Sequence, residues 1–185
     1  NEIHRVFDDT APQLDWKSDS HLFNASYAGL PLGTLTGYAY LLDFSNSLPN
    51  STQTYGLSFA GAKPVNKTVK ATYRLEYANQ SAYGDSALSY NADYYAAELG
   101  GATKSCSLSA GYEKLGSDSG VGFKTPLATL HAFDGWADVF LVTPAAGLTD
   151  TYVKATAKIP GSVPVGLTAV YHTFGTDKGP GTLGS

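Results

Sequence analysis

Residues 68–79, "TVKATYRLEYAN", alternate strictly between two kinds of side chain. The odd positions carry Val69, Ala71, Tyr73, Leu75 and Tyr77, and the even positions between them carry Lys, Thr, Arg and Glu. Successive side chains of a β-strand point to opposite faces of its sheet, so this alternation indicates a strand with one apolar and one polar face. The same pattern recurs along most of the chain.

Alternating runs bounded by Gly, Asn, Asp and Pro predict about eight strands. They lie near residues 20–28, 34–44, 53–61, 68–79, 89–100, 105–115, 150–159 and 164–174. Short links such as "GLPLG", "KPVNK", "GGATK" and "PGSVP" join alternate pairs, and the other connections are longer. We therefore predict an all-β, antiparallel up-and-down barrel of about eight strands, formed as one domain by residues 1–185. Residues 1–16 and 176–185 are expected to be irregular ends.

Composition supports a β-rich protein and excludes several functions. Charged residues make up 15% of the 185-residue chain, which also has 13 Tyr and 20 Gly, whereas ordinary soluble domains carry about 25% charge. The 12 Lys and Arg are scattered and the net charge is −4, so we expect no nucleic-acid partner. The single cysteine, Cys106, excludes an intramolecular disulfide.

The two faces of the predicted strands fit two opposite architectures. In an outer-membrane barrel the apolar face meets lipid and the polar face lines a hydrated lumen. In a soluble barrel, such as a lipocalin-like protein, the apolar face fills the interior or binds a small apolar ligand. Periodicity alone does not choose between them, although strand length and the low charge favour the membrane.

Five segments also resemble a known family. They are "DWKSDSHLFNASYAGLPLGTLTGYAYLLDFSNS", "TYGLSFAGAKPV", "YRLEYANQSAYGD", "NADYYAAELGG" and "GFKTPLATLHAFDGWADVFLVTPAAGLTDTYV". Together they resemble proteobacterial outer-membrane porin-like barrels grouped with the alginate-export family, over about residues 15–178. The resemblance implies a non-enzymatic barrel in the outer membrane of a Gram-negative bacterium, with a lipid bilayer around it and small solutes or saccharide passing through or binding.

The chain departs from that family in two respects. Family members are longer, and this sequence resembles their C-terminal half without the closing strand that ends in an aromatic residue. A fragment of a larger barrel, an excised domain and a self-contained eight-stranded barrel all remain compatible with this pattern. The soluble alternative would place the protein in the periplasm or outside the cell. No oligomeric state is predicted.

Charged and ionisable residues on the polar face are the candidate lining of a lumen. They are Lys70, Arg74, Glu76, Glu98, Glu113, Lys154, Lys158 and His172. They could set the field that a permeating solute meets. The alternative is mutual neutralisation, because charges in a narrow barrel interior must be paired.

The sequence gives little support for catalysis or metal binding. The four histidines lie on separate segments, and no metal-ligand spacing is present. The acidic stretches "FDDT", "SDS" and "TDK" offer oxygen ligands for Ca²⁺ but lack the regular pattern of a calcium loop. The stretch "GSDSG" has Asp118 where a nucleophile elbow needs Ser. We expect no enzyme activity, no bound metal and no cofactor.

Residues 116–149 form a long connection that we expect to be structured and partly helical. Thr125 followed by Pro126 is typical of a helix start, and the segment between predicted strands is long enough for two short helical pieces. Such a loop is usually a lid, a constriction or a binding surface. The candidate gate or cap residues are Phe123, His131, Phe133, Asp134, Trp136 and Asp138. The alternative is that its aromatic residues only hold the loop to the rim.

Overall fold

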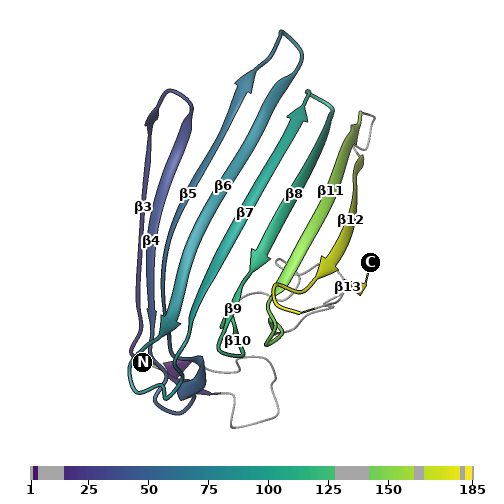
Figure 1. Cartoon of the computed structure of the whole chain (residues 1–185). Coiled ribbons are helices and arrows are strands. Elements are labelled where there is room, and N and C mark those ends of the chain that lie inside the picture. Colours follow the sequence, from purple (N-terminus) through teal and green to yellow (C-terminus); the bar gives the residue numbers. More distant parts are fainter. Residues whose placement is uncertain (1, 4–14, 128–141, 161–164, 180–181, 185) are drawn as a thin grey trace.

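The computed structural model describes residues 2–3, 15–127, 142–160, 165–179 and 182–184. Its main feature is one antiparallel sheet in the order β13-β12-β11-β8-β7-β6-β5-β4-β3 (Figure 1). Its strands are β3 (His21–Leu30), β4 (Gly33–Leu42), β5 (Thr52–Pro64), β6 (Lys70–Ala82), β7 (Asn91–Ala102), β8 (Cys106–Leu115), β11 (Leu148–Ile159), β12 (Val165–Gly175) and β13 (Thr182–Gly184). The predicted meander of eight long antiparallel strands is confirmed.

The sheet is open, and this differs from the predicted closed barrel. Within the described ranges β3 pairs with β4 only, and the opposite edge ends at β12 and the three-residue β13. Figure 1 shows β3 and β12 at opposite sides of the sheet. The alternation fixes strand pairing and facing, but it does not bring the first and last strands together.

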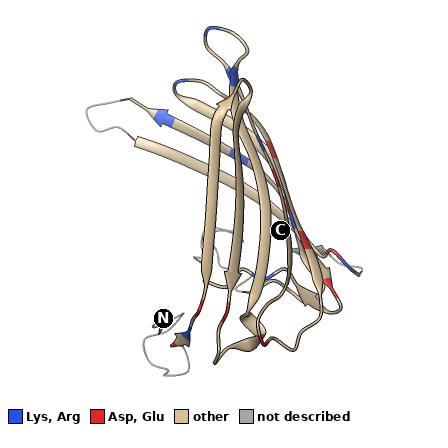
Figure 2. Cartoon of the chain, turned by 90° about the vertical axis from the view of Figure 1, so that its left-hand side faces the viewer, with Lys and Arg blue, Asp and Glu red and all other residues tan. Residues whose placement is uncertain are grey.

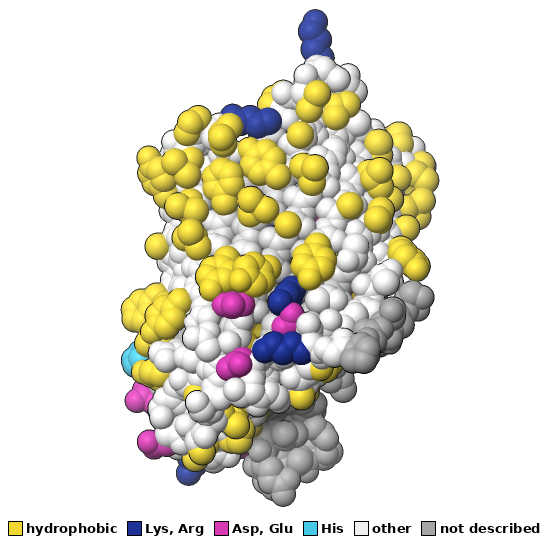
Figure 3. All heavy atoms as spheres, in the orientation of Figure 1, with side chains coloured by type: hydrophobic (Ala, Val, Ile, Leu, Met, Phe, Trp, Pro, Cys, Tyr) yellow, Lys and Arg dark blue, Asp and Glu magenta, His cyan; other side chains and the backbone are white. Residues whose placement is uncertain are grey.

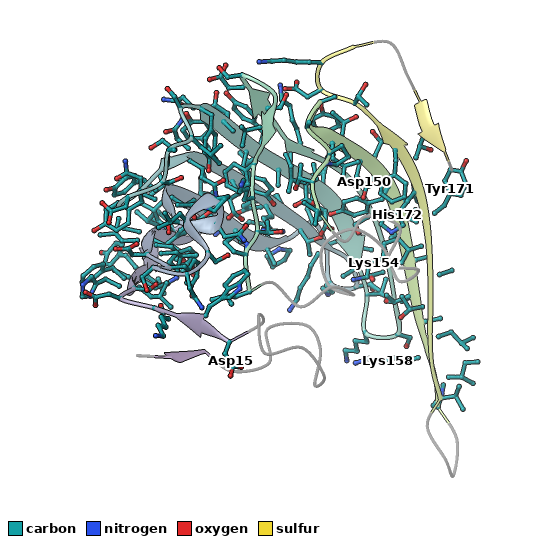
Figure 4. All side chains as sticks on the ribbon, turned by 90° about the horizontal axis from the view of Figure 1, so that it is seen from below. Asp15, Asp150, Lys154, Lys158, Tyr171 and His172 are labelled. Atoms are coloured by element: carbon teal, nitrogen blue, oxygen red, sulfur yellow. The ribbon has the colours of Figure 1, made fainter. Side chains whose placement is uncertain are left out.

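The sheet is curved, and its two faces differ in chemistry. Viewed from below, the strands bend around a concave side (Figure 4). Asp150, Lys154 and His172 point toward this side, whereas Tyr171 points away from it. The apolar residues of the alternating pattern therefore cover the convex face and the polar residues cover the concave face.

The convex apolar side chains are exposed. Leu57 is 52% exposed, Leu75 58%, Leu99 67% and Leu167 53%. A monomeric soluble protein rarely exposes so continuous an apolar surface. Figure 3 shows hydrophobic side chains spread across the upper part of this face, with acidic and basic side chains below them.

The buried core is small and lies at the end of the sheet that carries the long connections. One cluster comprises Ala78, Tyr90, Ala92, Leu115, Phe123, Leu148 and Phe174. A second comprises Trp16, Leu42 and Phe44, in which the rings of Trp16 and Phe44 are 4.7 Å apart. Packing therefore holds the long-loop end together, and strand pairing builds the rest of the sheet.

The described part of the long connection contains no helix, and the two predicted helical pieces fall mostly on residues 128–141, which lie outside the described residues. It begins with a hairpin of β9 (Ser117–Asp118) and β10 (Val121–Gly122). Thr125 and Pro126 start a turn, because Leu127 has a left-handed φ of 68° that a right-handed helix does not allow. The helical element that the structure does contain among its described residues is the short 3-10 turn η2 (Leu48–Asn50).

Both chain ends also carry short strands where irregular structure was expected. β1 (Glu2–Ile3) pairs with β2 (Trp16–Lys17), and β13 extends the main sheet beside β12. Both predicted end segments therefore take part in strand pairing.

Candidate functional site: the polar concave face

A cavity of about 470 Å³ lies against the concave face near the long-loop end. Its lining includes Tyr38, Arg74, Glu76, Tyr94, Glu113 and Lys124. Strands β4 to β8 supply most of these side chains, because the even-numbered residues of β4 to β7 and the odd-numbered residues of β8 point to this face. The lining is therefore mixed, with charged and tyrosine side chains beside Leu42, Leu115 and Leu127.

Tyrosines on the concave face reach across a neighbouring strand to a glutamate. Tyr152 of β11 lies opposite Gly111 of β8, which in turn lies opposite Glu98 of β7. The Tyr152 hydroxyl donates to Glu98 Oε2 at 2.7 Å. A Cβ added to Gly111 would lie only 2.2 Å from Cζ of Tyr152. The glycine thus gives the ring room to lie flat over the middle strand.

A similar arrangement recurs on the other side of the sheet, with the glutamate two residues from the position opposite the glycine. Tyr38 of β4 lies opposite Gly56 of β5 and donates to Glu76 Oε1 of β6 at 2.7 Å. A Cβ on Gly56 would be 2.1 Å from Cζ of Tyr38. Glu76 also pairs with the Arg74 guanidinium through its other oxygen. Two tyrosine–glycine–glutamate rows therefore tie alternate strands together.

A third tyrosine bond joins adjacent strands. The Tyr94 hydroxyl of β7 donates to Glu113 Oε1 of β8 at 2.5 Å. Each of the three predicted lumen glutamates is thus held by a tyrosine hydroxyl. Tyr38, Tyr94 and Tyr152 were missed as site residues, although their even parity already placed them on the polar face.

The predicted charges separate into two groups. Arg74, Glu76, Glu98 and Glu113 lie together, with Arg74 directly opposite Glu98 in the register. Lys70, Lys154 and Lys158 are exposed and lie toward the short-turn end, and they form no ion pair with any other described residue. Mutual neutralisation of charge therefore describes the residues in the middle of the concave face, whereas the three lysines of this face have no acidic partner among the described residues.

His172 does come together with an acid, but one that the sequence reasoning omitted. Its Nδ1 lies 2.7 Å from Asp150 Oδ2, and Asp150 is 3% exposed. Asp150 lies opposite Glu113 in the register. Asp150 has the same parity as Tyr152 and Lys154, so the alternation could have identified it.

Gln80 holds the start of the long connection against the concave face. This side chain is 1% exposed and donates from Nε2 to the Lys124 carbonyl at 2.8 Å and to Thr54 Oγ1 at 3.0 Å. Its Oε1 accepts from the Lys124 backbone N–H at 2.7 Å and from the Tyr90 hydroxyl at 3.0 Å. The side-chain amide of Gln80 therefore both donates to and accepts from the Lys124 backbone, as the backbone of a neighbouring strand would.

Lys124 links that point to a second loop. Its Nζ donates to the Pro49 carbonyl at 2.5 Å, within η2 between β4 and β5. Neither Gln80 nor Lys124 could be selected from the sequence, because their contact joins residues that are distant in the chain and belongs to no local pattern. Together they fix the loop wall of the cavity.

One predicted gate residue is described, and it is an anchor of the loop. Phe123 is 6% exposed, belongs to the buried cluster and lies 5.6 Å from the Tyr94 ring. Its backbone N–H donates to the Gly116 carbonyl at 2.8 Å. The other predicted gate residues, His131, Phe133, Asp134, Trp136 and Asp138, lie outside the described residues.

Burial and hydrogen bonding shift the pKa values of three side chains outside the long strands. Burial lowers the pKa of Lys124 and raises the pKa of Tyr90 to about 12. Burial alone would raise the pKa of Asp177, but hydrogen bonds from Lys114 and from the Ser117 backbone lower it overall. No cluster of three or more His, Cys, Asp or Glu suited to a metal occurs in the described ranges.

Tyrosines mark one limit of the apolar convex surface. Measured against β6, each successive tyrosine lies two residues farther along the strand. Tyr171 of β12 is level with Tyr73, and Tyr112 of β8 is level with Leu75. Tyr95 of β7 is level with Tyr77, and Tyr55 of β5 is level with Asn79. These tyrosines therefore follow a diagonal across the ladder, as a line at constant height does when strands are tilted. Just beyond the line, the Tyr77 hydroxyl donates to Asp93 and the Lys114 ammonium lies over the Tyr95 ring.

Comparisons with known proteins add no identification. No protein-family model, curated protein or solved structure matches the chain. Among the described residues, no helix has the length and apolar character needed to cross a membrane.

Proposed function

We propose that this chain forms the wall of an outer-membrane β-barrel through which small polar solutes pass passively. The observation that carries the proposal is the facing of the sheet: the exposed convex face is apolar and the concave face is polar. This is the arrangement of a transmembrane barrel with a hydrated lumen. A soluble barrel that binds an apolar ligand needs the opposite facing.

The diagonal of tyrosines supports the same proposal. Transmembrane barrels have tilted strands and aromatic side chains at the membrane interfaces. Tyr55, Tyr77, Tyr95, Tyr112 and Tyr171 are all at least 42% exposed and separate the apolar surface from charged side chains. Their oblique path through the register matches an interface that crosses tilted strands at one level.

Closure of the barrel is part of the proposal. An unpaired strand edge is not tolerated in lipid, because each unsatisfied backbone group costs several kcal/mol there. β3 and β12 carry no Lys, Arg, Asp or Glu, so no charged side chain on these strands opposes further pairing along the part of β12 that β13 leaves free. We propose that both edges are paired in the membrane, either with each other or with further strands.

Reconstitution tests the proposal directly. The chain should remain monodisperse only with detergent, float with phospholipid vesicles, and conduct ions in a planar bilayer. A monodisperse chain in plain buffer that binds an apolar fluorescent probe would instead support the lipocalin-like alternative.

A matched pair of variants tests which face meets lipid. Leu75→Lys places a charge on the exposed convex face, and Ser58→Lys places one on the concave face opposite Glu76. The cost of a lysine facing lipid rises from about 0–1 kcal/mol near the interface to about 2–4 kcal/mol at the bilayer midplane, so L75K should lower the stability of the reconstituted protein more than S58K. Equal effects would contradict the assignment of the faces.

A further inference from the structure

Lysines gather at the short-turn end of the sheet, and the function proposed above does not use them. Lys63 and Lys67 lie at the β5–β6 connection, Lys70 begins β6, Lys104 lies between β7 and β8, and Lys158 lies near the end of β11. All five are exposed. Figure 2 shows Lys and Arg at this upper end of the molecule and the Asp and Glu side chains farther down.

Charge is thus distributed unequally between the two ends. The short connections described at the lysine end contain no Asp or Glu. The long-loop end carries Asp15, Asp19, Asp43, Asp85, Asp118 and Asp177. Two lysines at the long-loop end pair with these acids, Lys114 with Asp177 and Lys178 with Asp118. Within the described part of the chain, the five lysines of the short-turn end have no acidic partner.

The lysines also adjoin the edge of the apolar surface. Val65, next to the lysines of the β5–β6 connection, is 67% exposed. Lys70 shares the parity of Arg74 and Lys158 that of Lys154, so both point to the concave face. The lysines placed to meet lipid are therefore Lys63, Lys67 and Lys104. An apolar side chain beside a lysine suits the boundary between acyl chains and headgroups, because the lysine stem lies along apolar surface while the ammonium reaches polar groups. Each exposed lysine at such a boundary attracts anionic lipid.

We infer that the short-turn end of the sheet, through Lys63, Lys67 and Lys104, binds anionic phospholipid headgroups. The inference rests on the proposed membrane location and adds to it a headgroup chemistry and an orientation. The lysine end lies in a leaflet that contains anionic phospholipid, and the acidic long loops project from the other side.

Spin-labelled lipids test the inference in reconstituted vesicles. The chain is incorporated into phosphatidylcholine vesicles that contain trace spin-labelled phosphatidylglycerol or spin-labelled phosphatidylcholine, and the motionally restricted fraction of each label is measured. One lysine near an anionic surface favours binding about fivefold. Averaged over all lipids that contact the protein, phosphatidylglycerol should be preferred about twofold, and the preference should fall at high salt.

Charge-removing variants assign the preference to this end. The variant K63Q/K67Q/K104Q should bring the preference close to one. The control K17Q/K178Q, which removes charge at the long-loop end, should leave it unchanged. A preference that is absent in the unmodified chain, or that survives the three substitutions, would overturn the inference while the protein still restricts phosphatidylcholine. Failure to restrict either lipid would overturn the proposed membrane function, and the inference with it.

Discussion

Gln80→Leu is the substitution whose consequence the structure defines most sharply. Leucine is similar in size to glutamine but has no hydrogen-bonding group. The change removes the two bonds with the Lys124 backbone, the bond to Thr54 and the bond from Tyr90. A buried hydrogen bond contributes about 1 kcal/mol net, so the four bonds together give a loss of about 4 kcal/mol in the free energy of unfolding.

Gln53→Leu is the matched control on the neighbouring strand. Gln53 donates to Ser81 at 3.0 Å and accepts from Tyr55 at 3.3 Å, and it is half-buried. Water can replace both bonds, so its removal should cost less than about 1 kcal/mol. Both variants should be unfolded by urea in the same vesicles or detergent.

Amide hydrogen exchange identifies where the loss occurs. The Lys124 N–H donates to a side chain, so its protection should fall strongly in Q80L while the ladder amides of β6 and β7 keep theirs. If Q80L and Q53L differ by less than about 1 kcal/mol, or if Lys124 N–H stays protected in Q80L, the reasoning that Gln80 holds the loop is refuted.

Three further predictions follow from the same contacts. Gly111→Ala should lower the stability measured by thermal unfolding by about 1–3 kcal/mol, because the alanine methyl group meets the Tyr152 ring. The control Gly166→Ala has open space around the added methyl group and should change the stability little, and a similar loss in both variants would contradict the role of Gly111. The raised pKa of Tyr90 means that the folded state binds the phenolic proton more tightly than the unfolded state, so the protonated Tyr90 contributes fully to stability below about pH 10 and this contribution is lost as the pH rises through about 12. Urea titrations should therefore show a smaller loss of stability over this pH window in Tyr90→Phe than in the unmodified chain. His172→Ala removes the partner of the buried Asp150 carboxyl group and should lower the urea midpoint. The double variant Asp150→Asn/His172→Ala should recover part of that loss because no unpaired charge remains, and the absence of any recovery would contradict a role for the His172–Asp150 pair in neutralising this acid.

The strands could be read from the sequence because they depend on local alternation. The run at residues 68–79 became β6, and its neighbours follow in the predicted order with boundaries shifted by a few residues. Which face is concave could not be read, because both faces of a strand have the same period of two. The curvature that decides it comes from the whole sheet.

The candidate site was predicted in part for the same reason. Parity placed Arg74, Glu76, Glu98 and Glu113 on one face, and the structure brings them together. Gln80 and Lys124 meet through tertiary packing of a loop, which no local pattern encodes. The helix expected at Thr125 failed because a favourable local start was overridden by the contacts of Lys124 and by the left-handed backbone of Leu127.

The tyrosine–glycine–glutamate rows have a consequence for how the strands find their register. A slip of one residue would exchange the two faces, so the apolar and polar alternation opposes it. A slip of two residues preserves both faces, and the alternation does not distinguish it from the native pairing. It would, however, place Ser109 or Glu113 beneath the Tyr152 ring, where only Gly111 leaves room. The glycine thus selects one alignment of β8 and β11 among those that the hydrophobic pattern accepts equally.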